Sequence, residues 1–369
     1  MRISVPSETA PGERRVSLVP DSIARLVKAG HEVVVQQGAG VNAGFRDAQY
    51  STAGARLAAS AAETCAGAAV VTRVQPPSAG EIAMIDPGAS VISLMKPGRN
   101  AELVAALSAR KLTGLALELV PRISRAQSMD VLSSQSTVAG YKAVLVGAAL
   151  LPRFLPMLTT AAGSIQPSRV FVIGAGVAGL QAIATARRLG AVVSGFDIRP
   201  AAREQVLSLG ATFVGGDSVS ADAQAKGGYA RAQTDEERAK TLAAMAAHLP
   251  EVDMVVTTAQ VPGRAAPKLI SADMVQTMRA GSVIVDVAAE SGGNCELTVP
   301  GETIVKHDVT ILAPLDLASS VPFHASQMFS RNVLTLLQHL TGKETTMTID
   351  LDDEITGAMV ITHAGAARA

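Results

Sequence analysis

Apolar and polar positions along this chain alternate in blocks that predict a repeating order of strands and helices. Apolar runs predict strands at Ile3 to Val5, Glu32 to Gln36, Ala69 to Arg73, Ser90 to Met95 and Leu112 to Leu117. Between them, Ser22 to Ala29 and Ala101 to Ala109 carry apolar residues on one helical face. Strands that alternate with helices form parallel sheets covered on both faces, so an α/β fold is expected.

A second block of the same kind follows. Arg169 to Ile173 is almost wholly apolar, as is typical of a strand buried on both faces of a parallel sheet. Leu180 to Leu189 has helical periodicity and Ala191 to Phe196 supplies the next strand, while Val252 to Thr257 and Ser282 to Asp286 are further predicted strands. We therefore expect two Rossmann-like domains with parallel, doubly wound sheets and a cleft between them.

Several segments interrupt or follow these blocks. Leu119 to Gln135 is polar and follows neither period, which predicts a long functional loop, with a simple connector as the alternative. Thr137 to Leu151 predicts a helix that bridges two domains, and the polar segment Asp217 to Lys240 predicts a mobile loop. Phe323 to Leu340 has helical spacing and returns to the first domain, whereas Asp350 to Ala369 is expected to be ordered in part at most.

These boundaries define the expected domains. An N-terminal Rossmann-like domain comprises residues 1–136 and 322–369, a linker helix comprises 137–152, and a second Rossmann domain comprises 153–321. The second domain contains the clearest motif of the chain.

Gly174, Gly176 and Gly179 directly follow the strand Arg169 to Ile173, in the spacing G-x-G-x-x-G. In dinucleotide-binding folds the first glycine permits a tight turn, the second lets the pyrophosphate approach the backbone, and the third lets helix and strand pack closely. A structural turn is the alternative, because glycine turns are common in loops. The order strand, glycines, helix and strand favours dinucleotide binding.

Asp197 closes the second strand, about 20 residues after the first glycine, where an acid accepts hydrogen bonds from the adenosine ribose. Its carboxylate would repel the 2′-phosphate of NADP, so the site is predicted to prefer NAD. Arg199 follows just past the strand. An arginine there can serve a 2′-phosphate, but beside Asp197 we interpret it as a solvated surface cation.

Composition and charge argue against other classes of protein. The 32 basic and 32 acidic residues cancel, and no long run of one sign suggests a nucleic-acid groove or an anionic-lipid anchor. Cys65 and Cys295 lie in no C-x-x-C or histidine-rich context, so neither a metal site nor a disulfide is indicated. The longest apolar run, Ala143 to Leu151, is far shorter than the ~20 residues of a spanning helix, and no signal segment precedes the first strand. We expect a soluble chain in a reducing compartment.

The whole chain resembles the alanine dehydrogenase and nicotinamide nucleotide transhydrogenase superfamily. The segments Pro6 to Pro20 (PSETAPGERRVSLVP) and Val285 to Glu296 (VDVAAESGGNCE) and the fingerprint GAGVAGLQAIATARRLGA are similar to that group. Pro121 to Ser136 (PRISRAQSMDVLSSQS) resembles a loop specific to the NAD(H)-binding domain I of proton-translocating transhydrogenase. In that domain the loop carries an arginine, a glutamine and an aspartate that order the nicotinamide end.

The fingerprint and the resemblance together assign the site residues, and no metal is implied. The residues assigned to catalysis are Arg122, Gln127, Asp130 and Ser133. Those assigned to cofactor binding are Gly174, Gly176, Val177, Ala178, Gly179, Asp197, Ile198, Arg199, Tyr229, Thr258 and Ala259. Tyr229 matches the tyrosine of the mobile loop in that family.

Alanine dehydrogenase is the alternative within the superfamily. Its substrate-binding lysine falls at Gln75 and its catalytic histidine falls within Leu94 to Lys96, so both are absent here. Arg15 matches the arginine that these enzymes use on the substrate carboxylate, and Glu290 stands where they have an acid. A non-catalytic NAD sensor is a further alternative, but a sensor needs no polar loop around the nicotinamide.

The resemblance implies hydride transfer between NAD(H) bound here and NADP(H) bound on a partner domain, coupled to proton movement through a membrane-spanning partner. Direct transfer between two nicotinamides moves no proton at the reacting carbons, so no general acid or base is required. The chain resembles the split bacterial form, in which domain I is a separate subunit and a homodimer is usual. Such a subunit is cytoplasmic, peripheral on the inner face of the cell membrane through its partner subunits.

Overall fold

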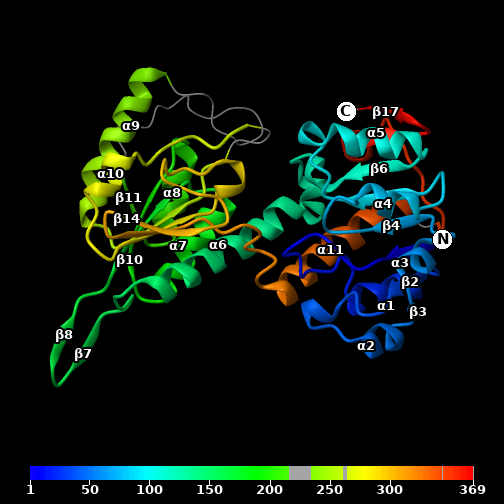
Figure 1. The fold of residues 1–369 in the computed structure, drawn as a ribbon, viewed down its shortest axis with the longest axis horizontal. Coiled ribbons are helices and arrows are strands. Elements are labelled where there is room, and N and C mark those ends of the chain that lie inside the picture. Colours follow the sequence, from blue (N-terminus) through cyan, green and yellow to red (C-terminus); the bar gives the residue numbers. More distant parts are fainter. Residues whose placement is uncertain (216–233, 261–263, 343, 369) are drawn as a thin grey trace. The chain divides into compact units, whose positions relative to one another are not determined.

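The chain folds into two compact units, which we treat separately. The computed structural model describes residues 1–215, 234–260, 264–342 and 344–368. Unit 1 consists of Met1–Gln135 and Ala318–Ala369, and unit 2 consists of Ser136–Leu317. Figure 1 shows the strands and helices of both units along the chain. Tyr229 and most of the predicted mobile loop lie outside the described residues.

Unit 1 is built on an eight-stranded sheet with the strand order β17-β16-β6-β5-β4-β1-β2-β3. Its strands are β1 (Arg2–Val5), β2 (Glu32–Gln36), β3 (Arg56–Ala58), β4 (Val70–Thr72), β5 (Ser90–Ser93), β6 (Thr113–Ala116), β16 (Val360–His363) and β17 (Ala366–Ala367). Strands β1 to β6 pair in parallel, whereas β16 is antiparallel to β6. The predicted α/β fold with a parallel sheet is therefore confirmed for this unit.

Helices cover the sheet of unit 1. They are α1 (Pro20–Lys28), α2 (Asp47–Thr52), α3 (Ala61–Cys65), α4 (Ala79–Ala83), α5 (Ala101–Ala109), α11 (Pro322–Thr341) and α12 (Glu354–Met359). Helix α11 buries Phe329, Val333 and Leu337 in the same apolar cluster as Ile3 and Val35 of the central strands. Burial of this aliphatic and aromatic stripe fixes α11 to a sheet made from residues about 300 positions earlier in the chain.

The end of the chain is more ordered than the sequence suggested. We expected Asp350 to Ala369 to be ordered in part at most, but Asp353 caps α12 and β16 joins the sheet. Thr362 Oγ1 accepts the N–H of Gly114 at 2.9 Å and donates to the carbonyl of Leu112 at 2.9 Å. The prediction failed because the polar character of this segment hid a strand whose partner lies far away in sequence.

Unit 2 is built on a seven-stranded sheet with the strand order β11-β10-β9-β12-β13-β15-β14. Its strands are β9 (Arg169–Ile173), β10 (Val192–Phe196), β11 (Thr212–Phe213), β12 (Met254–Thr257), β13 (Val283–Asp286), β14 (Thr303–Lys306) and β15 (Val309–Leu312). Only the pairing of β14 with β15 is antiparallel among these described strands. From β9, chain order runs outward through β10 to β11 and through β12 to β13, as in a doubly wound fold, and β14 lies at the edge beyond β15.

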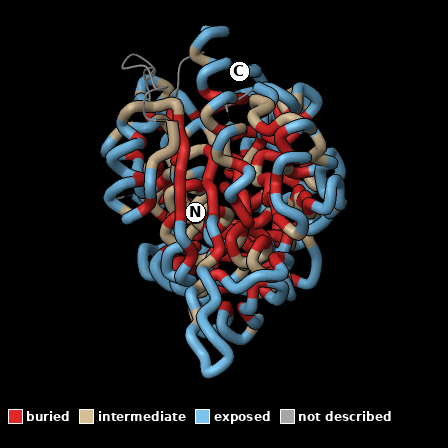
Figure 2. Tube along the Cα trace, turned by 90° about the vertical axis from the view of Figure 1, so that its left-hand side faces the viewer, coloured by how far each residue is buried: buried red, intermediate tan, exposed pale blue. Residues whose placement is uncertain are grey.

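Apolar clusters cover both faces of this second sheet. Helices α6 (Val131–Leu150), α7 (Val177–Arg188) and α8 (Pro200–Ser208) contribute to one cluster, and α9 (Asp235–His248) and α10 (Ala272–Gln276) contribute to the other. Figure 2 shows the buried strands inside a shell of exposed helices and loops. The hairpin of β7 (Leu158–Thr160) and β8 (Gly163–Ile165) is mostly exposed. No helix in the described part of the chain is long and apolar enough to cross a membrane.

Helix α6 begins earlier than the sequence predicted. We expected a helix from Thr137 to Leu151, but it starts at Val131. Both carboxylate oxygens of Asp130 accept hydrogen bonds from Ser133, at 2.9 Å from its N–H and 2.6 Å from its hydroxyl. This is the geometry of an N-cap, which satisfies a donor that the first helical turn leaves unpaired.

Replacing Ile361 of β16 tests whether the end of the chain is part of the core of unit 1. Ile361 is 1% exposed, so Ile361→Ala should lower the free energy of unfolding by about 2 to 4 kcal/mol through lost burial and a cavity. Val305→Ala is the control, because Val305 is 64% exposed and its loss should cost less than about 0.5 kcal/mol. Urea unfolding followed by circular dichroism measures both. Equal unfolding midpoints for the two variants would contradict an ordered tail.

Candidate dinucleotide-binding site

The glycine-rich turn lies between β9 and α7 in unit 2, and each of its glycines has a separate physical reason. Gly174 has φ of 96°, a conformation that side chains disfavour. A Cβ on Gly179 would lie 1.7 Å from the carbonyl oxygen of Gly174, so helix and turn touch through their backbones. A Cβ on Gly176 would meet nothing within 4 Å. The open space at Gly176, at the N-terminus of α7, is where a pyrophosphate can approach backbone N–H groups.

A second helix packs against the same turn. A Cβ on Gly140 of α6 would lie 2.0 Å from the carbonyl oxygen of Ala178 in the first turn of α7. Helices α6 and α7 therefore contact each other through backbone atoms. Helix α7 is packed against the glycine-rich turn on one side and against α6 on another. The neighbouring Val177 is 42% exposed at the start of α7.

Asp197 lies at the carboxyl end of β10, as predicted, and it is held by its own neighbours. Its Oδ2 accepts the N–H of Ala175 at 2.8 Å, which joins the acid to the glycine-rich turn. Arg199 donates to Oδ1 from its backbone N–H at 2.8 Å and from Nε at 2.9 Å, and to Oδ2 from Nη2 at 2.9 Å. Our interpretation of Arg199 as a solvated surface cation is therefore wrong, because the two charges form an ion pair with matching geometry.

The Asp197 pair changes the chemistry expected of a ribose site. Hydrogen bonding to Asp197 raises the pKa of Arg199, so the guanidinium stays charged. A ribose that binds Asp197 must share or displace donors already in place, because a carboxylate has about four lone-pair positions. Ile198 lies between these two residues and packs against the second apolar cluster of the unit.

Thr258 and Ala259 follow β12 and lie directly against the turn. The N–H of Thr258 donates to the carbonyl of Ile173 at 2.8 Å, and its Oγ1 donates to the carbonyl of Gly174 at 2.9 Å. A Cβ on Gly174 would lie 3.0 Å from the backbone nitrogen of Ala259. The carboxyl ends of β9, β10 and β12 thus bring together the described residues that we assigned to cofactor binding.

The residues assigned to catalysis lie in unit 1, on a segment that is shorter and more regular than the predicted loop. It contains two 3-10 turns, η3 (Leu117–Leu119) and η4 (Ser124–Met129). Ala126 and Met129 are buried in the core of unit 1, whereas Arg122 and Gln127 are exposed. Apolar anchors therefore hold the segment while these polar side chains face outward.

Sequence reasoning missed the residue that ties this segment to α11. Asn332 donates from Nδ2 to the carbonyl of Ser128 at 2.8 Å and accepts the hydroxyl of Ser134 at 2.7 Å. Nothing in the local pattern signals this contact, because Asn332 lies on a helix some 200 positions further along the chain. Asp130 and Ser133 are hydrogen-bonded to each other at the start of α6.

Models of one protein family match both halves of the chain. The description "Alanine dehydrogenase/PNT, N-terminal domain" covers residues 4–139, and "Alanine dehydrogenase/PNT, C-terminal domain" covers residues 143–369. The chain belongs to the alanine dehydrogenase/PNT family. Membership in this family implies a nucleotide-binding fold and NAD(H) binding.

Relatives within the alanine dehydrogenase/PNT family differ in their similarity to the chain. An NAD(P) transhydrogenase alpha-subunit chain of Rhodospirillum rubrum is 46% identical over 99% of this chain and 97% of its own length. The crystal structure of transhydrogenase from Sinorhizobium meliloti is 42% identical, covers 100% of both chains and has a TM-score of 0.90. Alanine dehydrogenase of Mycobacterium tuberculosis is 31% identical over 87% of this chain and 82% of its own. These similarities support a transhydrogenase component, with alanine dehydrogenase as a more distant relative.

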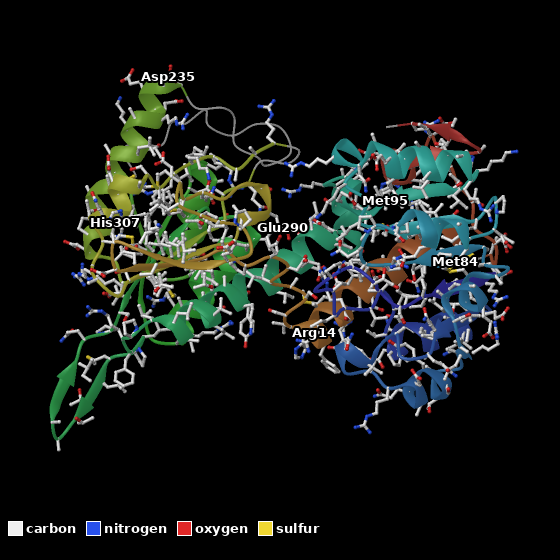
Figure 3. The ribbon with its side chains drawn as sticks, viewed as in Figure 1. Arg14, Met84, Met95, Asp235, Glu290 and His307 are labelled. Atoms are coloured by element: carbon white, nitrogen blue, oxygen red, sulfur yellow. The ribbon has the colours of Figure 1, made fainter. Side chains whose placement is uncertain are left out.

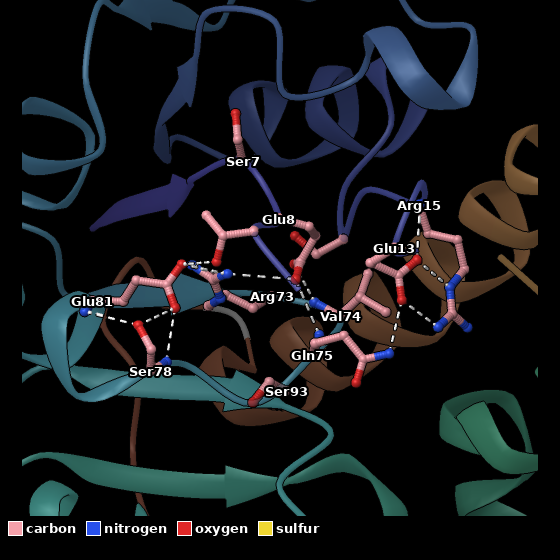
Figure 4. Close-up of polar contacts among 12 residues, drawn as sticks. Ser7, Glu8, Glu13, Arg15, Arg73, Val74, Gln75, Ser78, Glu81 and Ser93 are labelled. Carbon is pink, nitrogen blue, oxygen red and sulfur yellow. Dashed lines mark hydrogen bonds and ion pairs between the residues drawn. The ribbon is translucent and has the colours of Figure 1, made fainter. Parts of the chain in front are cut away.

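Arg15 and Gln75, which we matched to the substrate pocket of alanine dehydrogenases, lie with the buried Glu13 in one polar cluster of unit 1 (Figure 4). Arg15 Nη2 lies 2.6 Å from Glu13 Oε2, and Gln75 Nε2 donates to the same oxygen at 2.8 Å. Burial would raise the pKa of Glu13, but the hydrogen bonds from Arg15 outweigh it and hold the pKa at about 2. Arg15 also donates to Gln135 at 2.9 Å. A carboxylate of the chain itself therefore neutralises this arginine.

The other positions that we matched to alanine dehydrogenases, the Leu94 to Lys96 segment and Glu290, are hydrogen-bonded within their own units. The N–H of Met95, a residue just past β5 that Figure 3 labels, donates to Glu118 Oε1 at 2.9 Å. The N–H of Lys96 donates to the same oxygen. Glu290, also labelled in Figure 3, accepts the N–H of Asp316 at 3.4 Å. No cluster of three metal-binding side chains occurs among the residues that the structure describes.

The different spaces around Gly176 and Gly179 give a stability test of the turn. Gly179→Ala should lower the free energy of unfolding by about 3 kcal/mol or more, because the new methyl group overlaps the backbone of Gly174. Gly176→Ala should cost less than about 0.5 kcal/mol, since φ there is −74° and the added methyl group meets no atom. Thermal unfolding of both variants measures the difference. Similar losses for both would contradict the close backbone contact.

Proposed function

We propose that this chain is the NAD(H)-binding subunit of a proton-translocating NAD(P)⁺ transhydrogenase. It passes hydride between NAD(H) bound on unit 2 and NADP(H) bound on a partner domain. The observation that carries the proposal is the joint presence of a dinucleotide fingerprint that ends in an acid and of the polar segment from Pro121 to Ser136. The near full-length similarity to a transhydrogenase alpha subunit supports it.

The site residues fit a dinucleotide. Open space at Gly176 accommodates a pyrophosphate at the N-terminus of α7, and Asp197 offers carboxylate oxygens to the adenosine ribose. The nicotinamide supplies the hydride when it is bound. The chain's own residues bind and align it, and direct transfer demands ring distances of about 3 to 3.5 Å and exclusion of water.

Direct transfer explains why the chain needs no acid–base group. The reaction moves a hydride from one nicotinamide carbon to another, so no proton enters or leaves at the reacting atoms. Arg122 and Gln127 then act as hydrogen-bond donors that align the rings, and Asp130 and Ser133 hold the start of α6 behind them. Tyr229 is proposed to contact the nucleotide from the segment outside the described residues.

The proposed reaction requires partners. A membrane-spanning transhydrogenase domain conducts the proton, an NADP(H)-binding domain accepts or donates the hydride, and the chain forms a homodimer. We infer a cytoplasmic location, peripheral on the inner face of the cell membrane through these partners. No nucleic acid is involved.

Alanine dehydrogenase activity is the second candidate. Arg15 is the residue type that binds a substrate carboxylate in such enzymes, but here its guanidinium is already paired with Glu13. Gln75 and the Leu94 to Lys96 segment count against it, since they lack the lysine and the histidine that such chemistry uses. A non-catalytic NAD sensor would leave the exposed Arg122 and Gln127 without a purpose.

The Asp197–Arg199 pair predicts a preference for NADH over NADPH. The carboxylate of Asp197 would repel a 2′-phosphate. Arg199 is ion-paired with that carboxylate, so its guanidinium is not available to bind the phosphate. Asp197→Asn removes the charge and releases Arg199, so the NADPH affinity should rise about tenfold relative to the NADH affinity. Calorimetry with both nucleotides measures the ratio.

The double variant Asp197→Asn with Arg199→Ala is the matched control. It should lose the gain in NADPH affinity, because the released guanidinium is absent. Equal affinities of the unmodified chain for NADH and NADPH would contradict the assignment of Asp197.

Gln127 tests hydride transfer itself. Gln127→Asn shortens an exposed side chain by one methylene, which should hardly change NADH binding, whereas an alignment error of about 1 Å can cost on the order of 10²-fold in rate. We expect transfer to NADP⁺ on a partner domain to fall at least tens-fold. Stopped-flow transfer rates beside NADH titrations measure both quantities.

Ser128→Ala is the control for Gln127→Asn, because it alters the neighbouring exposed side chain and keeps the backbone carbonyl that Asn332 binds. A normal transfer rate for Gln127→Asn would mean that the segment is a connector. NADH formation from L-alanine and NAD⁺ would instead favour alanine dehydrogenase activity.

A further inference from the structure

One buried amide holds the backbone just past β12. Asn294 is fully buried. Its Oδ1 accepts the N–H of Ala259 at 3.0 Å, and its Nδ2 donates to the carbonyl of Ala259 at 2.8 Å and to the carbonyl of Pro267 at 2.9 Å. The side chain of Asn294 therefore hydrogen-bonds to both the N–H and the carbonyl of Ala259, and also to the carbonyl of Pro267.

A carboxamide is suited to this contact because it carries an acceptor and two donors, like the peptide group itself. Strand β12 pairs with β13 as far as Thr257, which lies opposite Asp286, and the N–H of Val287 donates to the carbonyl of Thr257 at 2.9 Å. Two residues further on, at Ala259, the side chain of Asn294 makes the backbone hydrogen bonds that a neighbouring strand would otherwise make. Without it, the part-buried N–H of Ala259 and the part-buried carbonyls of Ala259 and Pro267 would lose their partner.

The turn that carries Asn294 is itself fixed by a buried acid. Asp286 accepts the N–H of Cys295 at 3.0 Å and the hydroxyls of Thr257 and Thr298 at 2.9 Å and 2.6 Å. A Cβ on Gly293, whose φ is 78°, would lie 2.6 Å from Asp286 Oδ2. The backbone of Asn294 also accepts the N–H of Leu269 at 2.8 Å. The amide is therefore held in place before any ligand binds.

We propose that Asn294 is a positioning residue for the nicotinamide half of the bound dinucleotide, an inference that rests on the proposed function. Asp197 ends β10, on one side of β9, and there it faces the adenosine half. Thr258 and Ala259 directly follow β12, on the other side of β9, and contact the glycine turn. A dinucleotide that crosses the turn from β10 reaches Ala259 with its nicotinamide half, and Asn294 sets the position of that residue.

Binding of NADH and of ADP-ribose, which lacks the nicotinamide ring, separates this role from a general effect on folding. Asn294→Ala should weaken NADH binding on the order of tenfold, because the backbone at Ala259 loses its partner. ADP-ribose binding should change less than about twofold. Asn294→Asp keeps the shape but turns the donor into a carboxylate that faces two carbonyls, so it should behave in the same way. Calorimetry on the full chain measures each affinity.

Asp253→Asn is the matched control. Asp253 is a buried acid next to the opposite end of β12, where it accepts the N–H of Arg169 at 2.8 Å. This variant should reduce thermal stability without changing the ratio of the two affinities. Hydrogen exchange on the unmodified chain gives a measurement that needs no variant, and NADH should slow exchange at Ala259 more than ADP-ribose does.

The outcomes separate the two proposals. Equal weakening of both ligands by the Asn294 variants, or equal protection of Ala259 by both ligands, would overturn the positioning role while the proposed function stands. An unmodified chain that binds neither ligand would overturn both proposals. Selective loss of NADH binding supports the assignment of Asn294.

Discussion

The backbone contact between Gly174 and Gly179 is the constraint on which unit 2 depends. At this point strand and helix approach so closely that no side chain fits between them. The same turn receives Thr258 from β12 through a hydrogen bond to Gly174, and α6 reaches the first turn of α7 through Gly140. Because protein interiors are close-packed, a change at one of these contacts displaces the others. The geometry of the candidate site therefore depends on glycine at positions 140, 174 and 179, where no side chain would fit.

Buried carboxylates in both units accept hydrogen bonds from groups of the chain itself. Arg15 and Gln75 surround Glu13, Arg199 surrounds Asp197, and hydroxyls and N–H groups surround Asp286. A carboxylate such as Glu13, with a pKa of about 2, is a weak proton acceptor at neutral pH. Glu13 is therefore better suited to holding Arg15 and Gln75 in position than to proton transfer. That character agrees with a reaction that moves hydride between two bound rings.

The sequence predicted those features that depend on local pattern. The strand Arg169–Ile173, the helix Ala101–Ala109 and the three glycines were all identified, because apolar period and glycine spacing are local properties. The start of α6 was missed because it depends on the cap formed by Asp130 and Ser133. Strand β16 was missed because its partner β6 lies about 250 positions away. In the candidate site, the position of Asp197 could be predicted from its distance to the first glycine along the chain. Its ion pair with Arg199 could not be predicted, and neither could the hydrogen bonds of Asn294 and Asn332, because tertiary packing determines these contacts.

The discontinuous makeup of unit 1 has a consequence for synthesis on the ribosome. Its core needs Phe329 and Val333 from α11 and Val360 from β16, which are made after all of unit 2. Unit 2 is continuous in sequence, and domains fold as units while the chain emerges. The part of unit 1 that precedes unit 2 in the sequence therefore lacks a complete core until α11 and β16 have been made, whereas unit 2 can fold earlier. A chain released before α11 is made carries an exposed apolar sheet face, which makes such fragments prone to aggregation.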